Sequence, residues 1–311
     1  MLEFKKEQET VSISGIKFGG QVGENPTVLI GSIFNKGEKL VENEKLGVFN
    51  KEEAEKLICL QKELADKSGN PCMLDIYGTH ELALQKYVDF VANLTNEPFL
   101  LNVPSVEIRI NLLKYAQEIG LSNRVIYNSI NYTLMENEII AIRNYKIKSA
   151  LIQSLNPRNP TVKGMLSILH GNNEQAGLIE KSKRAGIENI LLFTSIFEVP
   201  TIGIASRGIY DLKQEFGFPT GTAPVGIIGR WCLKNKTFTG DYKKSCEAAG
   251  VAIAQAMGAD YIIYGSLKKA EYIFPAAAIV DAMISLNSRS TFGNRTISKE
   301  HPLKKLYFPL T

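Results

Sequence analysis

Amide, hydroxyl and carboxyl side chains recur at the ends of short apolar runs along this chain of 311 residues. One of them is charged, Asp75 in Cys-Met-Leu-Asp-Ile-Tyr, and the others are neutral donors and acceptors. The neutral ones are Ser32, Asn35, Asn102, Asn128, Ser129, Gln153, Asn156, Thr194, Ser195, Thr220, Thr222, Tyr264 and Ser266. A ring of this composition suits a neutral heterocycle that presents many hydrogen-bonding atoms, so we expect a polar small-molecule site.

A structural interpretation competes with the functional one for most of these residues. An Asn after a strand is often a turn or N-cap residue, which applies to Asn102 and Asn128. Asn156 precedes a proline and is typical of a loop boundary. Asp75 differs, because a carboxylate inside an apolar run needs polar partners, so a functional role is favoured for it.

The residue types and their spacing give little support for a metal site or a catalytic nucleophile. The 3 histidines and 4 cysteines have no ligand spacing, so we expect no zinc site. Cys72 lies in an apolar run and is predicted to be a core residue, and the isolated His80 is more typical of a structural role. The pair Lys268 and Lys269 follows the last apolar run, where it would suit either a phosphate or a solvated helix start.

Composition and charge narrow the class of protein. Hydrophobic residues make up 44% and charged residues 22%, which is ordinary for a globular protein. The formal net charge is 36 − 32 = +4, too weak a balance to indicate nucleic-acid binding. The first residues are charged, and no apolar stretch reaches roughly 20 residues. We therefore expect a soluble, cytoplasmic protein that does not insert into a membrane.

One pattern repeats along most of the chain, a short apolar run followed by a polar turn and an amphipathic stretch. The predicted strands are Thr27–Ile33, Cys72–Ile76, Phe99–Val103, Val125–Asn128, Ser149–Gln153, Asn189–Thr194, Phe218–Ala223 and Tyr261–Gly265. The predicted helices are Lys51–Lys67, Glu81–Leu94, Val106–Ile119, Met135–Tyr145, Thr161–Ala185, Arg207–Phe216, Tyr242–Met257 and Ala270–Ser285.

Continuous apolar strands indicate burial on both faces, as in a parallel sheet, and eight strand–helix units favour a (β/α)8 TIM barrel. An open doubly wound sheet is the alternative, but no Gly-rich GxGxxG turn follows the first strand. We predict one barrel domain over residues 1–311. Its extension, residues 1–26, contains a β-hairpin over Glu9–Gly20 that covers the N-terminal mouth, and residues 286–311 form a tail ending in apolar side chains.

Several long motifs resemble one family. They are PTVLIGSIF (26–34), GNPCMLD (69–75), FLLNVPS (99–105), RVIYNSIN (124–131) and GADYIIYGSLKKAEYIFPAAAIVDAMI (258–284). Over about residues 4 to 290 the chain is similar to the H-subunit family of tetrahydromethanopterin S-methyltransferase, which includes bacterial methylcobalamin:tetrahydrofolate methyltransferases. The resemblance implies a pterin-binding barrel and a homodimer. It also implies methyl transfer between N5 of a tetrahydropterin and the cobalt of a corrinoid (cobalamin-type) cofactor, which a partner protein holds.

The resemblance also implies roles for the strand-end residues. Asp75 would accept hydrogen bonds from the amino group and ring N–H of the pterin edge. Asn102 and Asn128 would be the catalytic amides, supplying a donor near N5 without a strong acid. The expected substrate-binding residues are Asp75, Asn102, Asn128, Ser129, Gln153, Asn156, Thr194 and Thr222. No cofactor is expected to bind tightly, since the corrinoid comes with its own protein.

Three positions depart from the family pattern. The third strand usually ends in a carboxylate but here ends in Asn102, and the sixth carries Phe193 where an Asp is usual. The motif after the seventh strand has Gly226 in place of an Asn. Three hypotheses follow: a tetrahydropterin methyltransferase, a divergent member acting on another small methyl compound, and a non-catalytic subunit that holds a partner protein. The sequence favours the first.

Overall fold

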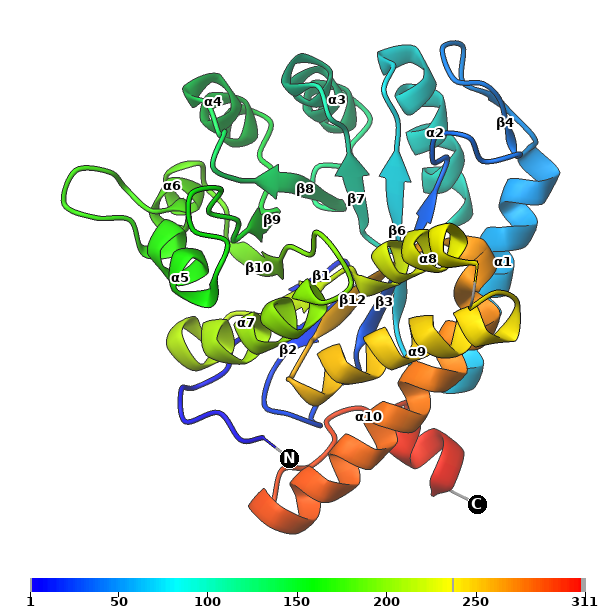
Figure 1. The fold of residues 1–311 in the computed structure, drawn as a ribbon. Helices are drawn as coiled ribbons and strands as arrows, with labels where there is room; N and C mark the ends of the chain where they lie inside the picture. The colour runs from blue at the N-terminus through cyan, green and yellow to red at the C-terminus, as the bar shows by residue number, and fades with distance from the viewer. Residues whose placement is uncertain (1, 237, 309–311) are drawn as a thin grey trace.

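Eight parallel strands close into a barrel in the computed structural model, which describes residues 2–236 and 238–308 (Figure 1). Neighbouring strands follow the order β10-β11-β12-β3-β6-β7-β8-β9, so the predicted (β/α)8 barrel is confirmed. The strands are β3 (Val28–Ile33), β6 (Cys72–Tyr77), β7 (Phe99–Asn102), β8 (Val125–Ile130), β9 (Ser149–Gln153), β10 (Asn189–Thr194), β11 (Thr220–Thr222) and β12 (Tyr261–Ser266).

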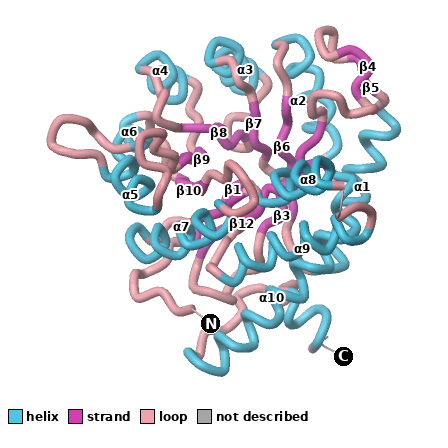
Figure 2. The backbone as a smooth tube through the Cα atoms, in the orientation of Figure 1, coloured by secondary structure: helices cyan, strands magenta, loops and turns pink. Residues whose placement is uncertain are grey.

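Helices surround these strands on the outside, as Figure 2 shows in cyan around magenta. They are α1 (Lys51–Ser68), α2 (Glu81–Leu94), α3 (Val106–Glu118), α4 (Glu136–Asn144), α5 (Val162–His170), α6 (Leu178–Arg184), α7 (Thr201–Phe216), α8 (Pro224–Asn235), α9 (Asp241–Ala256) and α10 (Ala270–Phe292), with a 3-10 turn η1 (Leu267–Lys269). Among the described residues, no helix is both long and apolar enough to cross a bilayer.

Two helix predictions were wrong in informative ways. The predicted helix over 161–185 is two helices, because Gly171 takes a positive φ of 76° and ends α5. No helix was predicted directly after β11, but α8 forms there and begins with Pro224. The proline suits that place because a first-turn amide has no helical partner to lose. α7 also begins earlier than predicted, and α10 ends later.

The predicted N-terminal hairpin is present and pairs β1 (Thr10–Ile13) with β2 (Ile16–Gly19) in antiparallel register. Its inward side chains, Ile13 and Phe18 among them, are buried against barrel-interior residues such as Met73 and Leu100. The hairpin therefore fills the N-terminal mouth, and the barrel interior is apolar there. A polar site has room only at the opposite, C-terminal end of the strands.

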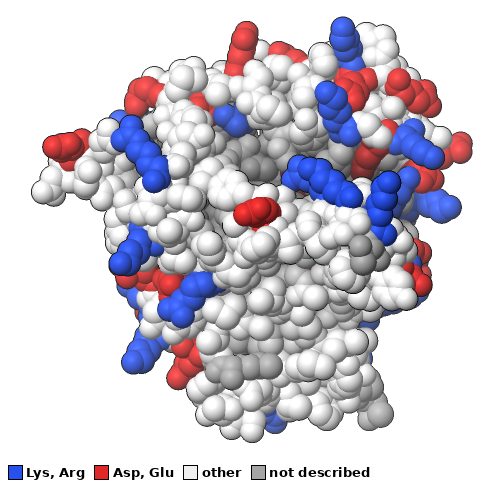
Figure 3. Space-filling view, in the orientation of Figure 1, with Lys and Arg blue, Asp and Glu red and all other residues white. Residues whose placement is uncertain are grey.

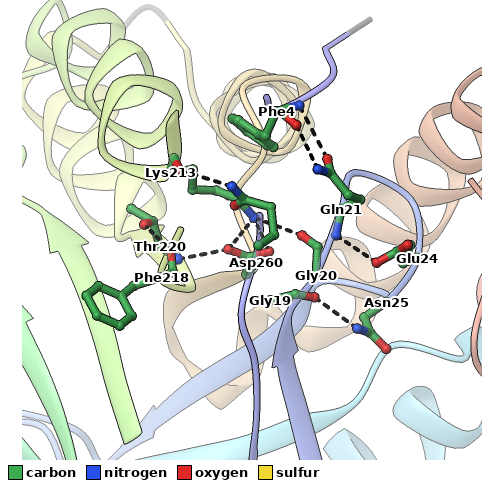
Figure 4. A network of polar contacts seen from close by, with 12 residues as sticks. Phe4, Gly19, Gly20, Gln21, Glu24, Asn25, Lys213, Phe218, Thr220 and Asp260 are labelled. Carbon is green, nitrogen blue, oxygen red and sulfur yellow. Dashed lines mark hydrogen bonds and ion pairs between the residues drawn. The ribbon is translucent and has the colours of Figure 1, made fainter. Parts of the chain in front are cut away.

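Polar networks fasten the N-terminal end of the barrel. The Lys213 ammonium, on α7, lies 2.5 and 2.7 Å from the two Asp260 carboxylate oxygens. Asp260 also accepts from the Thr220 amide at 2.8 Å, so it joins the strands β11 and β12 (Figure 4). Asp281, on α10, accepts four hydrogen bonds of 2.6–2.9 Å, from the Thr27 amide and hydroxyl and from the side chains of Asn70 and Gln255.

Two smaller segments complete the chain. A hairpin of β4 (Val41–Asn43) and β5 (Val48–Phe49) lies between β3 and α1. The tail after α10 returns to the body as the π-helical turn η2 (Leu303–Tyr307), in which Leu303 is buried while Tyr307 is exposed. Phe308 is exposed as well, and Leu310, the last apolar residue of the predicted tail, lies outside the described residues.

Candidate active site

A cavity of about 500 Å³ opens at the C-terminal ends of the strands. It is lined by Ser32, Asn35, Asp75, Asn102, Asn128, Ser129, Leu151, Gln153, Phe193, Ser195, Ile196, Phe197, Ala223, Gly226, Ile227, Arg230, Ile263 and Gly265. In the space-filling view the surface is hollowed in the upper centre, with Lys or Arg side chains at its rim (Figure 3). The structure thus brings five predicted site residues together: Asp75, Asn102, Asn128, Ser129 and Gln153.

Asp75 is the carboxylate of this cavity, and it is almost fully buried. Its Oδ2 accepts from the Ser32 hydroxyl at 2.7 Å and from the Asn102 amide nitrogen at 3.2 Å. Its Oδ1 is buried but has no partner among the described residues. Burial raises the pKa of this carboxyl to about 6, and the hydrogen bonds from Ser32 and Asn102 act against that rise. An unpaired oxygen in a cavity wall is an acceptor ready for a ligand N–H.

Asn102 and Asn128 end the neighbouring strands β7 and β8, in register with each other. The Asn102 amide is turned toward Asp75, whereas the Asn128 side chain makes no hydrogen bond within the described chain. Next to it, the Ser129 hydroxyl accepts from Asn131 at 3.3 Å. The two amides therefore differ in their availability to a ligand. Asn102 orients the Asp75 carboxylate, whereas the donor and the acceptor of Asn128 both remain free.

Backbone strain after β3 helps to place this wall. Phe34 has a φ of 65°, a left-handed conformation that is rare for a bulky residue. Its ring stacks on Tyr87 with centroids 4.0 Å apart and meets Phe49 edge-on at 4.8 Å. This buried aromatic contact holds the reversed backbone, and the chain then returns to the cavity with Asn35, whose amide donates to Glu38 at 3.2 Å.

Part of the cavity lining is apolar. Phe193 and Ile263 pack on the barrel core below the cavity. Above them, the Gln153 amide donates to the Ser195 hydroxyl at 3.0 Å, which fixes its orientation. A flat ring that satisfied Asp75 would have aliphatic and aromatic surface on which to lie.

Three predicted binding residues do not line the cavity. Thr194 and Thr222 are fully buried, and the Thr222 hydroxyl donates to the Thr194 carbonyl at 2.7 Å. The Thr194 hydroxyl in turn donates to the Gly221 carbonyl at 3.4 Å, so both hydroxyls join β10 to β11. Asn156 lies in the loop after β9, where its Oδ1 accepts from the Arg158 amide at 3.1 Å in a turn. The loop interpretation fits the geometry of Asn156.

Other sequence candidates also find structural places. Lys269 pairs with the buried Glu247 at 2.8 Å, so it is occupied, and the exposed Lys268 does not line the cavity. The buried Tyr264 hydroxyl donates to Gln61 outside the barrel. His80 precedes α2 and provides no side-chain cap. Within the described chain, no cluster of His, Cys, Asp and Glu has the arrangement of a metal site.

Sequence reasoning missed the contribution of α8. Gly226, Ile227 and Arg230 line the cavity from its first two turns. The available signal was Pro224 followed by a run of apolar residues, since Pro at the first helical position is typical of a helix start. The three positions that depart from the family pattern, Asn102, Phe193 and Gly226, all lie in this one cavity.

Comparisons with known proteins agree with the resemblance. Residues 6–294 match the family model described as tetrahydromethanopterin S-methyltransferase MtrH subunit. The H subunit of that enzyme from Methanothermobacter marburgensis is 35% identical over 316 residues, covering 98% of this chain and 100% of the relative. The H subunit of the putative methyltransferase mtx of Methanosarcina barkeri is 37% identical over 311 residues, again covering 98% and 100%.

Solved structures with the same fold include dihydropteroate synthases. The Yersinia pestis protein has a TM-score of 0.58 at 16% identity, covering 88% of this chain and 98% of that one. The Xanthomonas albilineans protein in complex with 7,8-dihydropteroate has a TM-score of 0.57 at 14% identity, with the same coverage. At this level of identity the likeness establishes the barrel fold.

Proposed function

The chain belongs to the H-subunit family of tetrahydromethanopterin S-methyltransferase, a methyltransferase family, and from this premise we propose that its cavity holds a tetrahydropterin during methyl transfer. The observation that carries the proposal is the unpaired Oδ1 of the buried Asp75. An acceptor of this kind in a cavity otherwise lined by amides, hydroxyls and apolar groups is suited to the donor edge of a neutral heterocycle.

The recognition step follows from the geometry at Asp75. Ser32 and Asn102 occupy Oδ2 and hold the carboxylate plane, so Oδ1 is the oxygen left to accept from the N–H groups of a ligand. The pterin edge offers an exocyclic amino group and a ring N–H. Both come within reach of one oxygen, and the charge on the carboxylate strengthens the contact. The ring then lies against Phe193 and Ile263.

Methyl transfer requires a hydrogen-bond donor at N5 of the pterin, where charge shifts as the N–C bond breaks. The methyl group leaves N5, the electrons of the broken N–C bond stay on nitrogen, and that nitrogen takes up a proton from solvent. The corrinoid of a partner protein supplies, when present, the cobalt that accepts or returns the methyl group. Asn128 has its amide free, so it is placed to donate a hydrogen bond to N5 as charge shifts there. Asn102 keeps Asp75 oriented meanwhile.

Association is the second part of the proposal: a corrinoid protein as partner and a second copy of this chain. The exposed tail side chains of Tyr307 and Phe308 support self-association. A face of α9 and α10 supports it further, since Ile253, Met283 and Leu286 are exposed there and Figure 3 shows that region without charged side chains. Light scattering at micromolar concentration that returned the mass of one chain would count against the dimer.

Calorimetric titration tests the proposal, with tetrahydrofolate, methyltetrahydrofolate and tetrahydromethanopterin as ligands. Asp75→Ala removes a charge-assisted contact and should weaken binding about tenfold to a hundredfold. Asn128→Ala removes a neutral one and should act less. Asn156→Ala is the matched control, because that amide serves a loop turn outside the cavity. If the wild type binds none of the three carriers at millimolar concentration, the proposal fails.

One observation favours a second candidate, a divergent enzyme for another small N- or O-methyl compound. Asn102, Phe193 and Gly226, the three departures from the family pattern, are all cavity-lining residues. The cavity therefore has one carboxylate and more apolar surface than the pattern implies. Titration with small methylamines and methyl ethers separates the candidates, because binding of these without binding of any pterin would favour the second.

A further inference from the structure

Arg230 is the feature of the cavity that the proposed function leaves unused. It lies on the second turn of α8, lines the cavity and is exposed. Of the described residues in the lining, Asp75 and Arg230 are the two that carry a charge. No carboxylate or carbonyl among the described residues pairs with its guanidinium. A guanidinium left free in a ligand cavity is a donor fork for an oxyanion.

The topology separates this cation from the polar edge site, because α8 follows β11 and Asp75 lies on β6, three places along the closed strand order. α8 follows β11, and β7, which carries Asn102, is four places from β11 in the closed eight-strand order. Asp75, on β6, is next to β7. Phe193, Ile227 and Ile263 provide apolar lining. The N-terminal turn of α8 also lines the cavity, and its partial positive charge adds to that of Arg230. The cavity is thus electrostatically polar, negative at one wall and positive at the other.

We propose that Arg230 is a specificity-determining residue that binds an anionic group on the tail of the methyl carrier. The inference rests on the proposed function, because the tail is defined relative to a pterin ring held at Asp75. A carrier with its ring edge on Asp75 directs its substituent away from that wall, across the apolar lining and toward α8. The cavity of about 500 Å³ falls in the range of about 300–1,000 Å³ that drug-sized ligands occupy, which leaves room beyond the ring.

The recognised chemistry is an oxyanion, either a carboxylate or a phosphate. The two are distinguished by the carrier, since the tetrahydrofolate tail ends in carboxylates and the tetrahydromethanopterin tail also contains a phosphate. A carrier without a tail, 6-methyltetrahydropterin, makes no contact with Arg230 on this account. The contribution of Arg230 should also fall at high salt, because an exposed ion pair is screened.

The experiment is calorimetric titration of three carriers, tetrahydrofolate, tetrahydromethanopterin and 6-methyltetrahydropterin, against matched variants. Arg230→Gln removes the charge at similar length, and Arg230→Lys keeps the charge without the fork. Lys234→Gln is the control, because it makes the same charge change one turn later on α8 at an exposed position outside the cavity. Asp75→Ala reports on the ring site in the same series.

We expect Arg230→Gln to weaken the binding of at least one tailed carrier about threefold to fivefold, with Arg230→Lys between. Binding of 6-methyltetrahydropterin should stay within about twofold, and Lys234→Gln should change neither. Equal affinities of wild type and Arg230→Gln for both tailed carriers would overturn the inference, and so would an equal loss for the tail-less carrier. In both cases a loss in Asp75→Ala keeps the proposed function. A wild type that binds no carrier overturns both.

Discussion

Asp281 on α10 and Asp75 on β6 are both buried, and at both positions burial raises the pKa of the carboxyl to about 6. Their surroundings differ. At the N-terminal end, Asp281 has partners on both oxygens, from Thr27, Asn70 and Gln255. At the C-terminal end, Asp75 has partners on one oxygen and none on the other. The same group is thus a structural tie at one end and an open acceptor at the other.

The two carboxyl groups differ in whether both oxygens have hydrogen-bond partners, and this difference, rather than burial or pKa, distinguishes their roles. A buried acceptor without a partner costs free energy, and a fold retains it where a ligand supplies the missing donor. The Lys213–Asp260 pair belongs with Asp281, since both oxygens of Asp260 are occupied. Asp260 and Asp281 hold elements together at the N-terminal end, whereas Asp75 at the C-terminal end keeps one oxygen without a partner in the described chain.

The largest expected effect is on stability, and it comes from removing the Asp281 hydrogen bonds at the N-terminal end of the barrel. Asp281→Ala removes the acceptor of the buried Thr27 N–H and one of the acceptors of the Asn70 and Gln255 amides. We expect the free energy of unfolding to fall by about 4 kcal/mol, measured by urea denaturation, with ligand affinity retained in the fraction that folds. An unchanged midpoint would show that Asp281 is no tie, and the contrast with Asp75 would disappear.

Replacement of Asp75 should instead raise the free energy of unfolding at neutral pH. A carboxyl pKa raised from 3.8 to about 6 means that the folded protein binds the proton more tightly, so stability falls as pH rises between these values. Asp75→Asn removes that penalty. The variant should match the wild type near pH 4 and exceed it by up to about 3 kcal/mol at pH 8. A less stable variant at pH 8 would mean that the carboxylate is structural.

The pH dependence of binding sharpens the contrast further. The proposed contact requires the ionised carboxylate, which is lost as pH falls through about 6. Carrier affinity of the wild type should be level above that pH and weaken by up to about tenfold for each pH unit below it. Asp75→Asn should bind more weakly than the wild type above pH 6 and lose this dependence. A wild-type affinity that stays level down to pH 5 would contradict the role of Asp75.

The smallest effect is expected at Gly226. A Cβ built there meets nothing within 4 Å, so the cavity has space for a larger side chain. Gly226→Asn restores the amide of the family pattern, and a helix gains slightly when its glycine is replaced, so stability should change by less than about 1 kcal/mol. Carrier affinity measured by calorimetry should be kept or improved. A strong loss of affinity would mean that the ligand occupies the open space at Gly226.

Much of the fold could be predicted from the sequence because the apolar runs are continuous and regularly spaced. The strands Ser149–Gln153 and Asn189–Thr194 have their predicted bounds. α8 was missed, and Arg230 with it, because Pro224 and Gly226 are typical of turns as well as of a helix start. Burial of its Val225 and Ile228 side decides between these two local possibilities in favour of the helix.

Residue type at a strand end predicts residues of one cavity when the strand phase is right. Asp75, Asn102 and Asn128 meet this criterion and line the same cavity, while their binding roles stay a prediction. The same criterion predicts Thr194 as a site residue. Side chains alternate along a strand, however, so Phe193 lines the cavity and the buried Thr194 does not. The phase of a short apolar strand is invisible when both faces are buried.

The most direct test of the central claim is methyl transfer itself. Methyltetrahydromethanopterin or methyltetrahydrofolate is mixed with free reduced cobalamin, and methylcobalamin formation is followed by absorbance with and without protein. We expect acceleration by the wild type and a normal rate for Asn156→Ala. For Asp75→Asn we expect a rate lower by about tenfold to a hundredfold, which corresponds to about 1.4–2.7 kcal/mol. No acceleration by the wild type with either carrier, or an equal rate for Asp75→Asn, would contradict the claim.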